Sequence, residues 1–89
     1  MIFDILLTDE AKKHIQFFKK NNKKISQRII KLIEDISKHP ETGIGKPEKL
    51  KYEYSGLYSR RITEFHRIIY KIDNDNNSVI ILSLYGHYD

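Results

Sequence analysis

The last third of the chain contains three consecutive runs with the alternation of β-strands, and these runs most constrain the fold. They cover residues 57–63, 66–72 and 78–84, and short connections at 64–65 and 73–77 join them. Strands joined so tightly lie antiparallel, because a parallel pair needs a crossover of about a dozen residues or more. The sequence therefore predicts an antiparallel meander, and its most apolar strand, the last, is expected at the centre of the sheet.

The first half of the chain predicts one strand followed by two amphipathic helices. Residues 2–7 are apolar and β-branched, and Thr8 can cap the helix that follows them. Two apolar stripes then recur at helical spacing, separated by Asn21 and Asn22 and ended by Pro40. Their members are Ala11, Ile15 and Phe18 in the first helix and Ile25, Ile29, Leu32, Ile33 and Ile36 in the second. This pattern is typical of a helical hairpin.

These elements predict a single α+β domain over residues 1–89. The order is β-α-α-β-β-β, with the helical hairpin packed on one face of a mostly antiparallel sheet and the other face open to solvent. Residues 40–47 contain two glycines and two prolines, which indicates a loop that delivers the chain to Glu48.

Composition narrows the classes of function. Lys and Arg number 16 against 12 Asp and Glu, and this net charge of +4 suits RNA, DNA or an acidic protein partner. The absence of cysteine excludes disulfides, thiol catalysis and Cys-ligated zinc. The four histidines lack the spacings of zinc sites, so we expect no metal and no cofactor. No apolar run approaches the length of a membrane span, so a soluble protein is expected, and the lack of cysteine favours the reducing cytoplasm.

Cations and aromatic rings concentrate on two neighbouring strands. Tyr58, Arg60 and Arg61 lie on the first, and His66, Arg67 and Tyr70 lie on the second. Positive charge beside flat rings suits an anionic, planar ligand, and nucleic acid fits this description. The arginines could instead be solvated or paired with Glu53 and Glu64, which leaves a structural role open.

A carboxylate and a C-terminal histidine complete a possible RNA cleavage site. Glu48 lies among lysines before the cationic strands, and His87 follows the last strand. Arg67 and His87 lie towards the same end of an antiparallel pair, because the turn joins the opposite ends. A carboxylate, an arginine and a histidine can act as base, charge stabiliser and acid when the RNA 2′-hydroxyl attacks its phosphodiester, without a metal. From spacing alone, a surface salt bridge remains the commoner explanation for Glu48.

Two other motifs favour structural interpretations. Residues 73–77 begin like a calcium loop but lack its later glycine and distal glutamate, so a hairpin turn is predicted. The lysine-rich helix pair could suggest a DNA-binding helix-turn-helix, yet the core explains the isoleucine stripe of the second helix.

Four motifs spread over the chain occur together at characteristic separations. They are Gly43-Ile-Gly-Lys-Pro-Glu-Lys-Leu-Lys51, Ser55-Gly-Leu-Tyr-Ser-Arg-Arg-Ile-Thr63, His66-Arg-Ile-Ile-Tyr70 and the terminal His87-Tyr88. In combination, these motifs closely resemble those of the YoeB (Txe/YoeB) toxins within the RelE-like superfamily. The resemblance covers essentially the whole chain, including the order and length of its elements.

This resemblance implies a toxin of a type II toxin-antitoxin system. Such a toxin is a ribosome-dependent endoribonuclease, an mRNA interferase that cuts messenger RNA in the ribosomal A site and inhibits translation. The fold is microbial-RNase-like and is often seen as a homodimer. A YefM-like antitoxin holds the toxin inactive, and operator DNA is bound only by the complex with the antitoxin.

The resemblance also assigns roles position by position. It places the general base at Glu48, the phosphate-contacting arginine at Arg67, the histidine acid at His87 and the active-site tyrosine at Tyr88. The expected RNA-binding residues are basic and surround this set; they are Lys46, Lys51, Arg60 and Arg61.

Three positions depart from the family pattern. Lys49 stands where a proline is common, Phe65 stands where the residue is often charged, and Asp89 adds a negative charge after the His-Tyr pair. Two other functions are left open beside the toxin. The second hypothesis is a catalytically silent RNA- or ribosome-binding module, and the third is a DNA-binding regulator. In the toxin interpretation, the open basic face is expected to bind an acidic partner segment that is disordered when alone.

Overall fold

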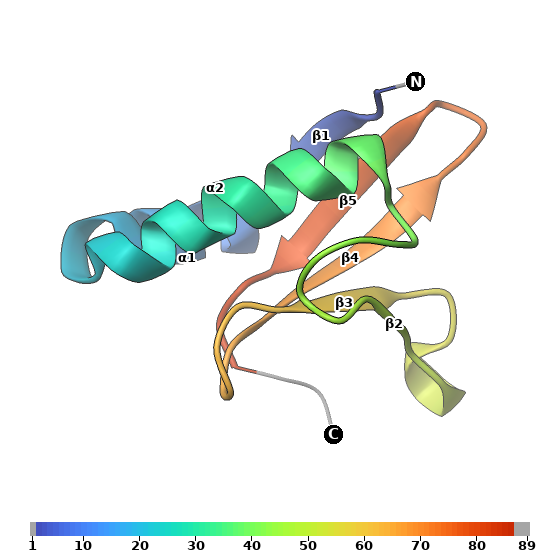
Figure 1. Ribbon diagram of the computed structural model, residues 1–89. Helices are drawn as coiled ribbons and strands as arrows, with labels where there is room; N and C mark the ends of the chain where they lie inside the picture. Colours follow the sequence, from blue (N-terminus) through green and yellow to red (C-terminus); the bar gives the residue numbers. More distant parts are fainter. Residues whose placement is uncertain (1, 87–89) are drawn as a thin grey trace.

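The computed structural model describes residues 2–86 and confirms the predicted α+β fold (Figure 1). Its elements are β1 (Asp4–Leu7), α1 (Asp9–Asn21), α2 (Lys23–Lys38), β2 (Glu48–Lys49), the 3-10 turn η1 (Tyr52–Tyr54), β3 (Tyr58–Arg61), β4 (Arg67–Asp73) and β5 (Ser78–Ser83). Within the described residues the strands form one five-stranded sheet in the order β1-β5-β4-β3-β2. Every neighbouring pair is antiparallel except β1 with β5, so the sheet is mostly antiparallel, as predicted.

The sheet differs from the prediction in two respects. The short strand β2, which the sequence pattern does not reveal, pairs with β3 through Glu48 with Ser59 and Lys49 with Tyr58. Because β2 extends the sheet beyond β3 and β1 extends it beyond β5, the central strand is β4 and not β5. Strand β5 is nevertheless interior, with a neighbour on each side, which explains its apolar sequence.

Capping residues set the boundaries of both helices. The Thr8 hydroxyl oxygen accepts a hydrogen bond from the Ala11 N–H at 3.1 Å, as predicted. Asn22 serves both helices: its N–H donates to the Phe18 carbonyl at 2.7 Å, and its side chain accepts from the Ile25 N–H at 3.1 Å. The tight turn of the helical hairpin is therefore made by one residue. In the described part of the chain, neither helix is long and apolar enough to cross a membrane.

Two segments share the covering of one sheet face, which we call the core face. Helices α1 and α2 pack over β1 and β5, whereas the loop of residues 39–47 crosses β4 and β3 (Figure 1). The helices thus cover only part of this face, and the loop covers the rest. The buried apolar residues of the core are Ala11, Phe18, Ile29, Leu32, Ile36, Ile62, Ile68, Tyr70, Val79, Ile81 and Leu84.

Strand alternation separates the core face from the opposite side, the helix-free face. On β4, Ile68 and Tyr70 belong to the core, so Arg67, Ile69 and Lys71 lie on the helix-free face. Ile69 is buried yet lies outside the core cluster, which agrees with this assignment. The open face expected from the sequence is therefore present, although it is not uniformly exposed.

A β-bulge near the end of β5 changes the direction of the side chains that follow. Tyr70 pairs with Ile81 and Ile69 pairs with Ser83, so Leu82 is an extra residue in β5. Beyond such a bulge, the alternation of side chains between faces reverses. Regular alternation along the last strand therefore does not predict the faces of its final residues.

Gly45 marks a close approach between the loop and the sheet. Its carbonyl accepts from the Arg61 N–H at 2.6 Å, its φ is +80°, and a Cβ there would lie 2.6 Å from Leu32 Cδ2. Gly45→Ala is expected to reduce the free energy of unfolding by about 2–4 kcal/mol, through left-handed backbone strain plus overpacking.

The matched control for this substitution is Gly56→Ala. Gly56 has a φ of +95°, but a Cβ there would meet nothing within 4 Å. Only the backbone strain remains, so a loss of about 1–2 kcal/mol is expected. Urea denaturation of both variants measures the difference, and equal losses would contradict the steric contribution at Gly45.

Candidate nucleic-acid cleavage site

Cross-strand register brings three of the predicted site residues onto the helix-free face. Arg61 of β3 pairs with Arg67 of β4, and Glu48 of β2 pairs with Ser59, two residues before Arg61. Paired residues share a face, so Glu48 and Arg61 are diagonal neighbours on adjacent strands. The backbones of such positions are typically about 7–8 Å apart. One carboxylate and two guanidinium groups therefore gather where β2, β3 and β4 meet.

The Arg61–Arg67 pair is electrostatically unfavourable without a ligand. Like charges directly opposite each other on neighbouring strands destabilise a sheet. Arg61 Nε is also buried without a hydrogen-bond partner within residues 2–86, and so is the Ser59 hydroxyl. Buried polar groups are normally satisfied, so unpaired donors beside two positive charges suit an oxyanion such as a phosphodiester.

Glu48 and the two predicted RNA-binding lysines lie at the rim of the surface around Arg61 and Arg67. The Glu48 side chain is exposed, and within residues 2–86 it makes no hydrogen bond or ion pair. Lys46 and Lys51 are exposed on either side of β2, and Lys46 adopts a φ of +50° directly after Gly45. A carboxylate without a fixed partner can reach a ligand, and the lysines can attract its phosphates.

The chain leaves β5 towards Arg67. The Arg67 N–H donates to the Gly86 carbonyl at 2.9 Å, so the last described residue lies directly against the start of β4. The predicted acid His87 and the predicted tyrosine Tyr88 lie outside the described residues. The expectation that Arg67 and His87 lie towards the same end of the strand pair therefore stays a prediction.

Arg60 is not available to RNA, in contrast to the expectation from the sequence. Its side chain is fully buried on the core face beneath the loop. One guanidinium nitrogen donates to Asp35 at 2.7 Å and to the Ile44 carbonyl at 2.8 Å. The other donates to the carbonyls of His39 and Thr42, which saturates the group with loop and helix partners. Adjacent strand residues face opposite sides, so only one of two consecutive arginines can serve the helix-free face.

Two tyrosines predicted as possible stacking platforms also serve the loop. The Tyr70 hydroxyl accepts from Arg60 Nε at 3.1 Å and donates to the Pro40 carbonyl at 2.6 Å. Tyr58 stacks on Tyr70 with ring centroids 5.8 Å apart and donates to Glu41 at 3.1 Å. Burial raises the pKa of both phenols, and the Glu41 carboxylate raises that of Tyr58 further.

Asp35 is the charged partner that balances the buried guanidinium. Burial acts to raise the pKa of Asp35, but hydrogen bonds from Arg60 and the Ile44 N–H outweigh it. The charges of Arg60 and His39 act in the same direction as these bonds, so the pKa lies below its ordinary value of 3.8. Asp35 therefore stays ionised at neutral pH and fixes Arg60 against α2.

Sequence reasoning missed two residues of this region. Ser59 shares a strand face with Arg61, so alternation alone could have added it to the set. His14 accepts a hydrogen bond from the Leu84 N–H at 3.0 Å, across 70 residues of sequence. No local pattern signals a contact at such a separation.

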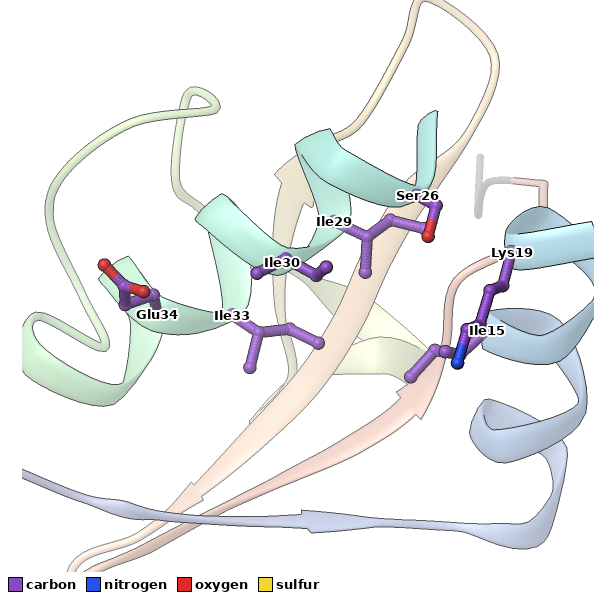
Figure 2. A pocket seen from close by; sticks show the side chains of 7 residues that line it. All are labelled: Ile15, Lys19, Ser26, Ile29, Ile30, Ile33 and Glu34. Atoms are coloured by element: carbon purple, nitrogen blue, oxygen red, sulfur yellow. The ribbon is translucent and has the colours of Figure 1, made fainter. Parts of the chain in front are cut away.

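The apolar groove shown in Figure 2 is separate from this surface. It lies between α1 and α2, with isoleucine side chains along it and Lys19 and Glu34 towards its two ends. Such a lining lacks the concentration of cations that RNA requires. Residues 2–86 also contain no group of three or more His, Asp or Glu side chains placed to hold a metal ion.

Comparisons with known proteins all point to one family. A family model described as the YoeB-like toxin of bacterial type II toxin-antitoxin systems matches residues 7–88. Toxin YoeB of Escherichia coli strain K12 is 37% identical over 84 residues, which cover 94% of this chain and 98% of that protein.

Solved structures agree with the sequence match. The YoeB dimer from Staphylococcus aureus has a TM-score of 0.87 and 37% identity, covering 99% of this chain and 100% of that one. The heterotetrameric YoeB-YefM toxin-antitoxin complex from the same organism gives a TM-score of 0.85 with the same identity and coverage. Both the fold and the sequence thus place the chain among the same toxins.

Proposed function

Because this chain belongs to the YoeB-like toxin family of bacterial type II toxin-antitoxin systems, we propose that it is an endoribonuclease that cuts messenger RNA in the ribosomal A site. The observation that carries the proposal is the cross-strand register, which puts Glu48 beside the Arg61–Arg67 pair on the helix-free face. A carboxylate next to paired arginines can combine a general base with stabilisation of a phosphorane.

The proposed reaction is an internal attack within the RNA and requires no metal. Glu48 takes the proton of the 2′-hydroxyl, the 2′-oxygen forms a bond to phosphorus, and the bond from phosphorus to the 5′-oxygen breaks. His87 gives a proton to that leaving oxygen, so the products are a 2′,3′-cyclic phosphate and a 5′-hydroxyl. Arg67 stabilises the charge on the phosphorane, and Tyr88 acts with His87 as a residue of the proposed active site.

The remaining residues of the proposed site bind the RNA backbone. Arg61 pairs with Arg67 and carries a buried, unpartnered Nε, which supports a contact to the same or the next phosphate. Lys46 and Lys51 at the rim add longer-range attraction, which favours association with the ribosome and its messenger. Arg60 is left out of the proposed RNA-binding set because its guanidinium is buried and saturated.

The proposed protein partners follow from relatives. The YoeB-YefM complex from S. aureus supports a YefM-like antitoxin, and the YoeB dimer supports a homodimer. We propose that an acidic segment of the antitoxin covers the Arg61–Arg67 surface, and that operator DNA is bound only by the complex. Affinity for the antitoxin that does not fall with rising salt would contradict the electrostatic contact.

Glu48→Gln is the experiment that tests the proposed function. Cleavage of a reporter messenger RNA in a translating extract is expected to slow by about 10²–10⁴-fold, because the amide cannot accept the 2′-hydroxyl proton. His87→Gln is expected to give a loss of the same order. Glu53→Gln, which removes an exposed carboxylate from η1, is the matched control and should cut at the normal rate.

Undiminished cleavage by both Glu48→Gln and His87→Gln would overturn the acid–base mechanism. Translation that stays inhibited in these variants without RNA cleavage would instead indicate the catalytically silent ribosome-binding module. The two results are distinguished by probing the reporter RNA for new 5′ ends in the same reactions.

A further inference from the structure

The three residues after β5, 84–86, form an exit segment that two histidines hold from different parts of the chain. The Leu84 N–H donates to His14 Nδ1 of α1 at 3.0 Å. The Gly86 N–H donates to His66 Nδ1, just before β4, at 2.9 Å. The N–H groups of Leu84 and Gly86 thus donate to imidazole nitrogens and not to carbonyls of a neighbouring strand.

Packing reinforces these two hydrogen bonds. The ring of Tyr85 lies against both histidines, with centroid distances of 4.6 Å to His66 and 5.9 Å to His14. Phe18 of α1 stacks on Tyr85 at 5.9 Å and contacts His66 edge-on at 5.0 Å. Leu84 is fully buried, so the exit segment is anchored on both sides of Tyr85.

Both bonds require the neutral form of the imidazole with its proton on Nε2. An Nδ1 atom accepts from an amide only through its lone pair, and protonation would turn it into a second donor facing the N–H. Burial lowers the pKa of His66, and repulsion from His14 lowers it further, which favours the accepting form. Within residues 2–86, the titratable side chains that face His66 are His14 from α1 and Tyr85 from the exit segment.

We propose that His14 and His66 are positioning residues that fix the exit segment beside Arg67 and so restrain the chain directly before the proposed acid His87. The Gly86 carbonyl already accepts from the Arg67 N–H at 2.9 Å, so the two histidines and Arg67 fix the same three residues. We call the pair of hydrogen bonds from the exit segment to His14 and His66 the clamp. The role of His87 as the acid rests on the proposed function, whereas the clamp does not. Misplacement of an acid by about 1 Å can cost about 10²-fold in rate.

The test compares two substitutions at each histidine. His14→Phe and His66→Phe keep a ring for packing but remove the acceptor, whereas His14→Asn and His66→Asn keep an acceptor oxygen near the position of Nδ1. The first readout is amide hydrogen exchange of Leu84 and Gly86 in the full chain, carrying Glu48→Gln to permit expression. Exchange of the amide facing the substituted histidine is expected to accelerate about five-fold in the Phe variants and to stay near normal in the Asn variants.

The second readout is cleavage by the four variants with Glu48 restored. We expect kcat to fall about 10–100-fold in the Phe variants with KM within two-fold of normal, and the Asn variants to recover most of this loss. A third readout needs no variant: in the chain with both histidines intact, the Gly86 amide resonance should shift as the pH falls from 8 to 5, because His66 then loses its acceptor lone pair. The Gly86 resonance is expected to move with a midpoint below the ordinary histidine pKa of 6.5.

The outcomes separate the clamp from the proposed function. Unchanged exchange in both Phe variants, or equal behaviour of Phe and Asn variants, overturns the clamp. If a Phe variant does not fold, a Gly86 amide resonance that does not shift between pH 8 and pH 5 overturns it instead. Faster exchange with an unchanged kcat overturns the positioning role. Absence of cleavage by the unsubstituted chain refutes the proposed function, and the exchange data then still decide whether the clamp exists.

Discussion

Arg60→Ala is expected to lower the free energy of unfolding by about 3–5 kcal/mol, because it breaks a buried ion pair by removing one partner. Arg60 is completely buried, and its guanidinium donates hydrogen bonds to Asp35 of α2, to the Tyr70 hydroxyl and to the loop carbonyls. Alanine would leave those carbonyls and a carboxylate without their donor beneath the loop. The loop that carries the chain to Glu48 would lose its main attachment to the sheet.

The neighbouring substitution Arg61→Ala is the matched control for stability. It removes the same side chain from the next position of β3, but on the helix-free face, where Arg61 opposes another arginine. A change within about 1 kcal/mol is expected, and relief of repulsion could even stabilise the protein. Urea denaturation followed by circular dichroism gives both values, and similar losses for the two variants would contradict the role of Arg60 in the loop.

Two further measurements refine the Arg60 prediction. Arg60→Lys is expected to recover little stability, because one ammonium group cannot reproduce the planar fork that contacts Asp35 and the loop carbonyls. The pKa of Asp35 lies below 3.8 in the folded state, so the unfolded chain binds a proton first as the pH falls. The contribution of Asp35 is therefore fully present above pH 3.8 and is lost as the pH falls through the folded pKa. This acid-dependent loss should shrink in Arg60→Ala.

The order of elements could be predicted from the sequence because local signals encode it. Capping by Thr8, the break at Asn22 and the spacing of apolar residues depend on neighbours within a few positions. The position of β2 is different, because a strand of two residues has no periodicity of its own. Its existence depends on the register with β3, and that register depends on the loop that Arg60 holds.

The candidate site was predictable only in part for the same physical reason. Alternation requires Arg60 and Arg61 to face opposite sides, but it does not say which side the loop of residues 39–47 will cover. Burial of Arg60 with Asp35 decides this, and the contact joins positions 25 residues apart. The bulge at Leu82 and the bond from Leu84 to His14 likewise depend on tertiary packing, so the path towards His87 could not be read from alternation.

Substitution at Arg67 is expected to give the second large effect, this time on catalysis and not on stability. Arg67→Gln should lower the kcat of messenger RNA cleavage by about 10²–10³-fold, because the cation proposed to stabilise the developing phosphorane is lost and Arg61 alone remains nearby. KM should change by less than about three-fold if the charge acts mainly in the transition state. Arg67→Lys should recover part of kcat, because it restores the charge without the two-pronged geometry.

Lys71→Gln is the control that makes the Arg67 result decisive. Lys71 lies on the same face of the same strand, is exposed, and carries the same charge, so its removal tests general attraction of RNA to this surface. A catalytic role for Arg67 predicts that Lys71→Gln leaves kcat unchanged and alters only the salt dependence of KM. A surface that merely binds the ribosome predicts that both variants weaken binding to a similar extent and that neither changes kcat. A kcat defect confined to the Arg67 variant, in protein of unchanged unfolding midpoint, would assign Arg67 to cleavage, because general electrostatic attraction does not discriminate between two cations on one strand face.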